Sequence, residues 1–280
     1  MSSSIRLLRL SIFAGSAGFA FEEPRDIILN SATRDQRDID LRKNYTYVFH
    51  QQEQELDSSG KVKSTKSESF DVTILYGRPY ERLIEKDRKP LPPDREKKES
   101  EKMDKELARR QKESEKSRSK RLKEEQRDLE EQKEMGREVA DAFHFQLLGS
   151  ERIAGQEAWV IQAEPRRDYR PRSRPARILP KVRGKLWITK NDYRWVKVEA
   201  EVIDTFSFGL VLLRIHPGMK LTFEQTRVQD EVWMPQRAWL RGSARVALLK
   251  KINGEMLVTW DNYRKFQAES RVVSVAQEPQ

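Results

Sequence analysis

The chain has 280 residues, with 55 Lys and Arg against 45 Asp and Glu, and it contains no cysteine. This length is ample for a hydrophobic core, whereas the absence of cysteine excludes disulfides, zinc–thiolate sites, thiol catalysis and attachment of lipid to a thiol. The formal charge of +10 is concentrated in one segment, because residues 164–185 hold 9 basic and 2 acidic residues and most of the remaining chain is balanced.

The first twenty residues are typical of a bacterial secretory signal. Arg6 and Arg9 precede an apolar run over 10–21, and the small residues Gly18 and Ala20 lie near its end. The run is too short to span a bilayer, which needs about 20 apolar residues. We therefore expect residues 1–20 to be a signal peptide, and the protein to be exported to the periplasm as a soluble molecule without a lipid anchor.

The segment after the signal has the pattern of a helix followed by strands. Residues 25–43 mix isoleucine and leucine with charges, as a short amphipathic helix does. Apolar residues then alternate over 45–50 and again over 70–76, which indicates two half-buried strands. Gly60 supplies the positive φ that a tight turn between them favours. A further short strand is predicted over 79–87.

A highly charged insertion follows the proline run at 90–93, which ends the sheet because proline has no amide proton to donate. Residues 94–138 contain 16 basic and 15 acidic residues, of types with strong helix propensity. They predict a long charged helix, or a helical hairpin if the chain breaks near Ser117–Ser119. Two roles remain open, a solvated arm and an arm that binds a partner.

Strand patterns resume at Phe143 and continue almost to the end of the chain. They cover 143–147, 158–163, 183–190, 193–204, 219–224, 233–249 and 255–266. In the fourth of these, strict alternation predicts that Val196 and Val198 share a face. Asn253-Gly254 is a strong hairpin signal, so a turn is expected there. About ten strands with short turns predict one antiparallel meander, curved or partly closed, because a large open sheet exposes its edges.

Three segments carry a family resemblance: LLGSERIAGQEAWVIQAEP, RGKLWITKNDYRWVKVEAEVID and FEQTRVQDEVWMPQRAWLRG. The features that match are Gly155, Trp159 to Pro165, Leu186 to Ile188, and Val232 to Pro235. In this order they resemble the outer-membrane lipoprotein-sorting superfamily, whose members include LolA, the mycobacterial lipid carriers LppX and LprG, and periplasmic sigma-E regulators. The resemblance covers about 143–264, with weaker support over 44–87.

The resemblance implies an α+β fold in which the curved antiparallel meander forms a half-open β-barrel with lid helices. Residues 21–280 would form this domain, interrupted by the charged helical insertion at 94–138. Such proteins carry acyl chains or sense lipoproteins without catalysis. The insertion and the arginine-rich segment are departures from the common pattern of the superfamily.

No motif in the sequence indicates an active site. The histidines, His50, His144 and His216, have no metal-ligand spacing. The chain has no GxSxG, GxxxxGK[ST] or GxGxxG motif, and no signature of a nucleic-acid-binding fold accompanies the positive charge. We therefore expect a protein that is not an enzyme, that has no cofactor or metal, and that does not bind nucleic acid.

Two groups of residues are candidates for binding. The candidates for the apolar concave surface are Trp187, Trp195, Phe206, Phe208, Leu210, Leu212 and Trp239. The candidates for an anionic partner are Arg166, Arg167, Arg170, Arg172, Arg174 and Arg177, because guanidinium forks suit phosphate. The leading hypothesis is a periplasmic carrier or sensor of a lipid or an acylated lipoprotein. The alternative is an envelope interaction module whose arm and arginine loop bind a protein or an anionic membrane surface.

Overall fold

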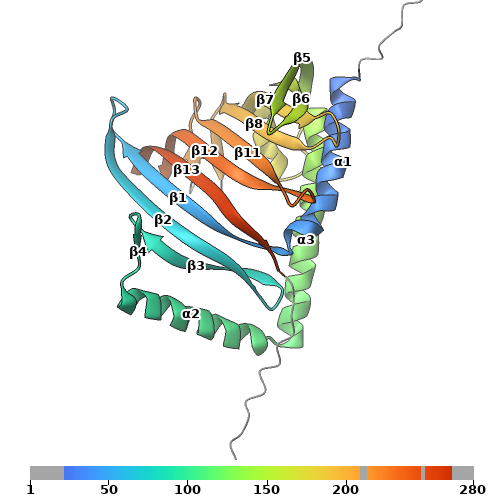
Figure 1. Ribbon diagram of the computed structural model, residues 1–280. Helices are drawn as coiled ribbons and strands as arrows, with labels where there is room; N and C mark the ends of the chain where they lie inside the picture. The colour runs from blue at the N-terminus through green and yellow to red at the C-terminus, as the bar shows by residue number, and fades with distance from the viewer. Residues whose placement is uncertain (1–21, 209–212, 247–249, 267–280) are drawn as a thin grey trace, which may run out of the picture.

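A computed structural model describes residues 22–208, 213–246 and 250–266, so the predicted signal peptide lies outside the described residues. The chain folds into helices packed on one large sheet (Figure 1). The helices are α1 (Pro24–Arg42), α2 (Pro93–Gln111), α3 (Glu115–Ala142) and the 3-10 helix η1 (Pro175–Lys181). Helix α1 agrees with the helix expected over 25–43.

The sheet contains 13 strands. The first six are β1 (Tyr45–Leu56), β2 (Val62–Leu75), β3 (Arg78–Lys86), β4 (Lys89–Pro90), β5 (Phe143–Ile153) and β6 (Gln156–Pro165). The others are β7 (Val182–Thr189), β8 (Trp195–Val202), β9 (Phe206–Phe208), β10 (Leu213–Ile215), β11 (Lys220–Val228), β12 (Val232–Val246) and β13 (Lys250–Lys265). Their pairings are antiparallel throughout.

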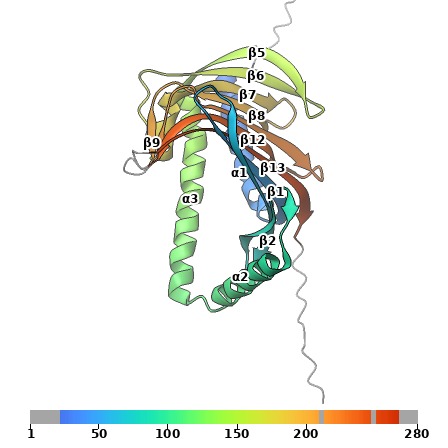
Figure 2. The same cartoon turned by 90° about the vertical axis from the view of Figure 1, so that its left-hand side faces the viewer.

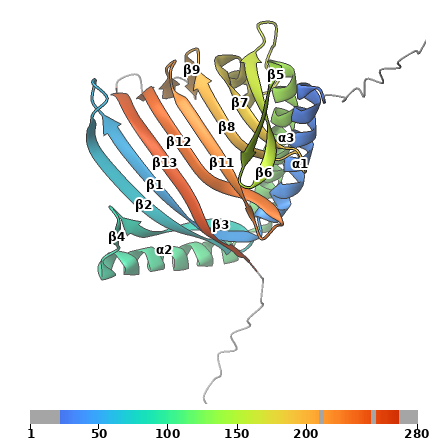
Figure 3. The same cartoon turned by 45° about the horizontal axis from the view of Figure 1, so that its top comes forward.

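The strands follow the order β4-β3-β2-β1-β13-β12-β11-β8-β7-β6-β5, and β9 and β10 form a side hairpin on β12. Within the described part of the chain the two end strands, β4 and β5, do not pair, so the sheet is open rather than a closed barrel. The sheet is strongly curved (Figures 1 and 3). The fold class expected from the sequence, an α+β half-open barrel with helices, is confirmed.

The two glycine turns expected from the sequence had different outcomes. Gly60 has a φ of 85° in the β1–β2 turn, and the Asp57 carboxylate there accepts the amide protons of Ser59 and Lys61. The prediction of a turn at Asn253-Gly254 is wrong, because both residues lie inside β13 and Gly254 pairs with Gly242. A Cβ on Gly242 would lie 2.7 Å from Met219. Close packing against Met219 therefore explains the glycine at position 242, the partner of Gly254 in the sheet.

The main core lies between the β5–β8 end of the sheet and two helices. Ile27 and Ile28 of α1 and Ala140 of α3 pack against Ile161 and Ile188 of the sheet, and all are buried. Both helices lie on the concave side of the sheet (Figure 2). They approach one another closely where a Cβ on Gly136 would be 3.2 Å from the Cβ of Ala32.

The charged insertion is helical, as expected, but it breaks earlier than the sequence suggested. Helix α2 ends at Gln111 and α3 begins at Glu115, so the break is at 112–114 and not at Ser117–Ser119. Ser114 is the N-cap of α3, and its hydroxyl accepts the Ser117 amide proton. A serine oxygen that satisfies a free amide in the first turn fixes where a helix starts.

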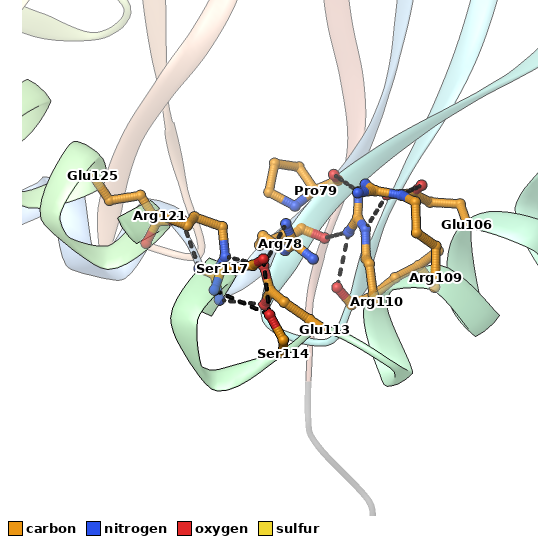
Figure 4. A network of polar contacts seen from close by, with 11 residues as sticks. Arg78, Pro79, Glu106, Arg109, Arg110, Glu113, Ser114, Ser117, Arg121 and Glu125 are labelled. Atoms are coloured by element: carbon orange, nitrogen blue, oxygen red, sulfur yellow. Dashed lines mark hydrogen bonds and ion pairs between the residues drawn. The ribbon is translucent and has the colours of Figure 1, made fainter. Parts of the chain in front are cut away.

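The insertion is exposed over most of its length, as a solvated arm would be, but it is attached to the rest of the fold through α2 and through the end of α3. We call α2 and α3 together the bracket. At one end α2 lies along β3, and the Arg110 guanidinium donates to the carbonyl oxygens of Leu75, Arg78 and Pro79 (Figure 4). At the other end the last turns of α3 enter the core. The bracket thus connects the β3 side of the sheet to its β5 side.

Candidate functional site

The register of four central strands aligns two rows of apolar side chains. One row contains Val198, Phe223, Ala238 and Val258, and the other contains Ala200, Leu221, Leu240 and Met256. Directly paired residues of antiparallel strands point to the same face. Val198 packs against the core cluster that holds residues of α1 and α3. Both rows therefore lie on the concave face, and we call them the concave rows.

The concave rows are only partly covered. Phe223, Leu240, Met256 and Val258 are half-buried, although they point to the inner face of the sheet. Helices α1 and α3 pack over the β5–β8 end of the sheet, α1 also contacts β12 near its own C-terminal end, and α2 lies along β3 (Figures 1 and 2). An inner face with half-buried apolar side chains is an accessible apolar floor.

Three cavities meet at Trp195, at the helix-covered end of the concave rows. One of about 280 Å³ lies under α1 and is lined by Trp195, Val198 and Phe223. A second of about 580 Å³ separates α1 from α3. A third of about 130 Å³ lies beside Val139 and Leu179 and is almost wholly apolar. Because Trp195 lines all three, this residue is the centre of the candidate site.

A further cavity lies toward the opposite side of the concave rows. It has a volume of about 370 Å³ and is lined by Leu240 and Met256 together with polar residues. Beyond Met256 its row continues onto Glu53 of β1 and Lys66 of β2. The floor therefore changes from apolar to charged across the sheet. Such a surface suits an amphipathic ligand, with its apolar part over β8–β13 and its polar part over β1 and β2.

Buried charges fix α1 over this site. Asp38 of α1 is buried and pairs with Arg194 at 2.9 Å. Burial raises the pKa of Asp38, and the charges of Arg194 and Arg42 oppose that increase. Arg42 donates to the backbone carbonyl of Trp233 and pairs with Asp35 at 2.7 Å. These contacts join α1 to the sheet on both sides of the cavity under it.

The structure separates the apolar residues that the sequence grouped together. Trp195 lies at the centre of the site, and Phe206 is buried. Trp187 donates its indole proton to Glu151 and stacks with Lys197, and Trp239 pairs with Leu257 and donates to Glu255. These two tryptophans therefore lie on the convex face. Leu210, Leu212 and the side chain of Phe208 lie outside the described residues.

Alternation alone could not find the concave rows because of an irregularity in β8. The register shifts where Ile188 pairs with Trp195 and Trp187 pairs with Lys197. As a result Val196 packs in a cluster with Trp187 and Trp233, whereas Val198 packs with the helices. The expectation that Val196 and Val198 share a face is wrong, and only the pairing could have shown it.

The arginine-rich segment at 164–185, here called the arginine loop, is attached to α3 rather than free. Arg166 pairs with Asp168 at 2.8 Å, and Arg172 pairs with Asp141 of α3 at 2.7 Å. The guanidinium of Arg170 contacts backbone carbonyls of its own loop. The other candidates, Arg167, Arg174 and Arg177, are exposed.

The part of the chain that the structure describes has neither a metal site nor a membrane-spanning helix. No group of three or more His, Cys, Asp or Glu side chains is placed to hold a metal ion there. Nor does that part contain a helix with the length and apolar character needed to cross a membrane.

Several solved structures are similar to this chain. A putative outer membrane lipoprotein-sorting protein domain from Vibrio parahaemolyticus is 11% identical, with a TM-score of 0.36 over 88% of this chain and 94% of that one. A DUF1329 family protein from Desulfovibrio piger is 12% identical, with a TM-score of 0.34 over 89% and 96% of the two chains. A LolA superfamily protein from Nitrosomonas europaea is 9% identical, with a TM-score of 0.30 over 87% and 94%.

The superfamily named in two of these structures is the one that the sequence motifs resemble. No family model matches the chain, and no curated protein matches it. The half-barrel architecture is defined by the strand order and the helix positions given above.

Proposed function

We propose that the protein binds the acyl chain of a lipid or of an acylated lipoprotein on the concave rows, as a periplasmic carrier or sensor that catalyses no reaction. The observation that carries this proposal is the half-buried apolar floor that leads into the cavities at Trp195. Removing apolar groups from water contributes about 0.8 kcal/mol per methylene, so five buried methylenes would contribute about 4 kcal/mol. The charged residues of β1 and β2 would lie beside the polar end of the ligand.

The direct test is mass spectrometry of the protein purified from its native host, together with titration by a fluorescent fatty acid. A matched pair of variants localises the binding. Met256 lies on the concave face, and its neighbour Leu257 lies on the convex face of the same strand. Met256→Gln places an amide in the apolar floor and should weaken binding about tenfold or more, whereas Leu257→Gln should bind as the wild type does. Equal affinities of the two variants, or the absence of any bound lipid, would contradict the proposal.

The alternative of a protein-interaction module rests on the exposed side of the bracket. Leu107 of α2 and Leu122 of α3 are 40% and 50% exposed. A Leu107→Gln, Leu122→Gln double variant should keep fatty-acid binding if the concave rows are the functional site. Loss of a protein partner in a pull-down, with lipid absent from the wild type, would favour the interaction module instead.

A further inference from the structure

The arginine loop carries positive charge that the protein does not neutralise. Among the described residues, the side chains of Arg167, Arg174 and Arg177 contact no carboxylate, and Arg170 contacts carbonyl oxygens only. All four are exposed. Ion pairs occur throughout the rest of the described surface, including the bracket. The positive charge of these four guanidinium groups is therefore available to an external anion.

The backbone that carries these arginines is held in place. Glu138 of α3 is buried, and its carboxylate accepts the Tyr169 hydroxyl proton and, at 2.9 Å, the Arg172 amide proton. The Arg166 amide donates to the Ala142 carbonyl at 2.8 Å. On the far side of the loop, Ala176 and Leu179 of η1 are buried in the core. The arginines thus project from a fixed backbone, which lowers the entropy lost on binding.

The large apolar side chains of the loop pack inward. Tyr169 and Ile178 lie against the main core cluster, so the outward surface offers guanidinium groups and the exposed Pro175, with no aromatic or large aliphatic anchor among the described residues. A protein interface usually has an apolar or aromatic centre. A surface of phosphate groups needs only fixed, spaced positive charges that can form bidentate contacts. The loop is therefore better suited to a phospholipid surface than to a protein.

We propose that Arg167, Arg170, Arg174 and Arg177, here called the arginine face, dock the protein on a membrane surface rich in anionic phospholipid. The position of the loop gives this docking a direction. Pro175 lines the cavity between α1 and α3, and Leu179 lines the apolar cavity beside it. Docking through the arginine face would bring the cavity end of the half-barrel toward the bilayer. This proposal goes beyond the binding of an acyl chain and does not depend on it.

The test is flotation with two kinds of vesicle, phosphatidylcholine alone and phosphatidylcholine mixed with phosphatidylglycerol. We expect the protein to bind only the mixed vesicles and to be released as the salt concentration rises. The four residues of the arginine face are changed together to Gln. The control changes four exposed cations of the bracket to Gln, so that both variants lose the same charge: Lys116, Arg118, Lys120 and Arg127.

Each arginine near an anionic surface contributes about fivefold to affinity, so the arginine-face variant should bind roughly 100-fold or more weakly. The bracket variant should lose about tenfold at most, because its charges are already paired with neighbouring carboxylates or lie away from the loop. An equal loss in both variants would overturn the proposal, because net charge alone would then explain binding. Unchanged vesicle binding by the arginine-face variant, with loss of an acidic protein partner, would overturn it in favour of a protein ligand.

The two proposals fail separately. Met256→Gln should bind mixed vesicles as the wild type does, even if it loses the fatty acid. The arginine-face variant should still bind the fatty acid in solution. Loss of vesicle binding in Met256→Gln would mean that the apolar floor, rather than the arginine face, attaches the protein to lipid, and would overturn the docking proposal.

Discussion

Removing Arg110 should release α2 from the sheet. The side chain of Arg110 is 9% exposed, and its guanidinium donates to the carbonyl oxygens of Leu75 and Arg78 at 2.9 Å and of Pro79 at 3.1 Å (Figure 4). It also pairs with Glu106 and lies over the ring of Tyr80, 5.9 Å from the ring centroid. One side chain therefore makes most of the polar contacts between α2 and the β2–β3 turn.

The expected magnitude follows from the number and burial of these bonds. A hydrogen bond to a charged group contributes about 1.5–3 kcal/mol, but three acceptors share one guanidinium and the turn carbonyls regain water when α2 leaves. We therefore expect Arg110→Ala to lower the free energy of opening of α2 by about 2–4 kcal/mol. Its neighbour Arg109 is 68% exposed and forms its ion pair with Glu106 of the same helix. Arg109→Ala should cost less than about 1 kcal/mol, as exposed ion pairs do.

The assay is hydrogen exchange resolved by residue, with chemical denaturation as a measure of global stability. Arg110→Ala should speed exchange of the α2 amides, and exchange in β11–β13 should be unchanged because the loss is local. Arg110→Lys should resemble Arg110→Ala, since one ammonium group cannot span three carbonyls. The reasoning is refuted if Arg109→Ala and Arg110→Ala accelerate exchange equally, or if neither changes it.

Two further predictions concern the loop and the sheet. Burial raises the pKa of Glu138, but hydrogen bonds from Tyr169, Arg172 and Ser173 outweigh it and lower the pKa from 4.5. The stabilisation of the loop by Glu138 should therefore be complete above pH 4.5, and it should be lost as the pH falls through the lowered pKa of Glu138 in the folded protein. Hydrogen exchange of residues 167–174 should show this pH dependence, and Glu138→Gln should abolish it. A Cβ on Gly184 would lie 2.2 Å from the Glu199 carbonyl oxygen, whereas a Cβ on Gly77, at a φ of 73°, meets nothing within 4 Å. Gly184→Ala should thus cost about 3 kcal/mol or more and Gly77→Ala about 1 kcal/mol, as measured by denaturation; similar costs would contradict the close approach of β7 and β8.

Local patterns in the sequence predicted most of the elements. Alternating apolar residues predicted the strands around Tyr45 and Phe70, and the charged composition predicted the helices of the insertion. Both predictions succeeded because these patterns depend only on residues a few positions apart in the chain. The same reasoning failed at Asn253-Gly254, where a turn motif lies inside a strand. There the pairing of Gly254 with Gly242 on β12 places the motif inside the sheet, and this pairing is not visible in a local window.

The sequence by itself determined that the protein is a curved antiparallel sheet with helices and one cationic loop. Only the tertiary structure decided which face each apolar residue occupies, because alternation separates two faces without saying which one is concave. In addition, the register shift in β8 interrupts the alternation, so residues on either side of it do not keep the faces that alternation assigns to them. Trp195 and Trp239 look equivalent in the sequence, yet they lie on opposite sides of the sheet. The tertiary structure also showed that Arg172 of the cationic loop is neutralised, since its carboxylate partner Asp141 lies on α3, 31 residues earlier in the chain.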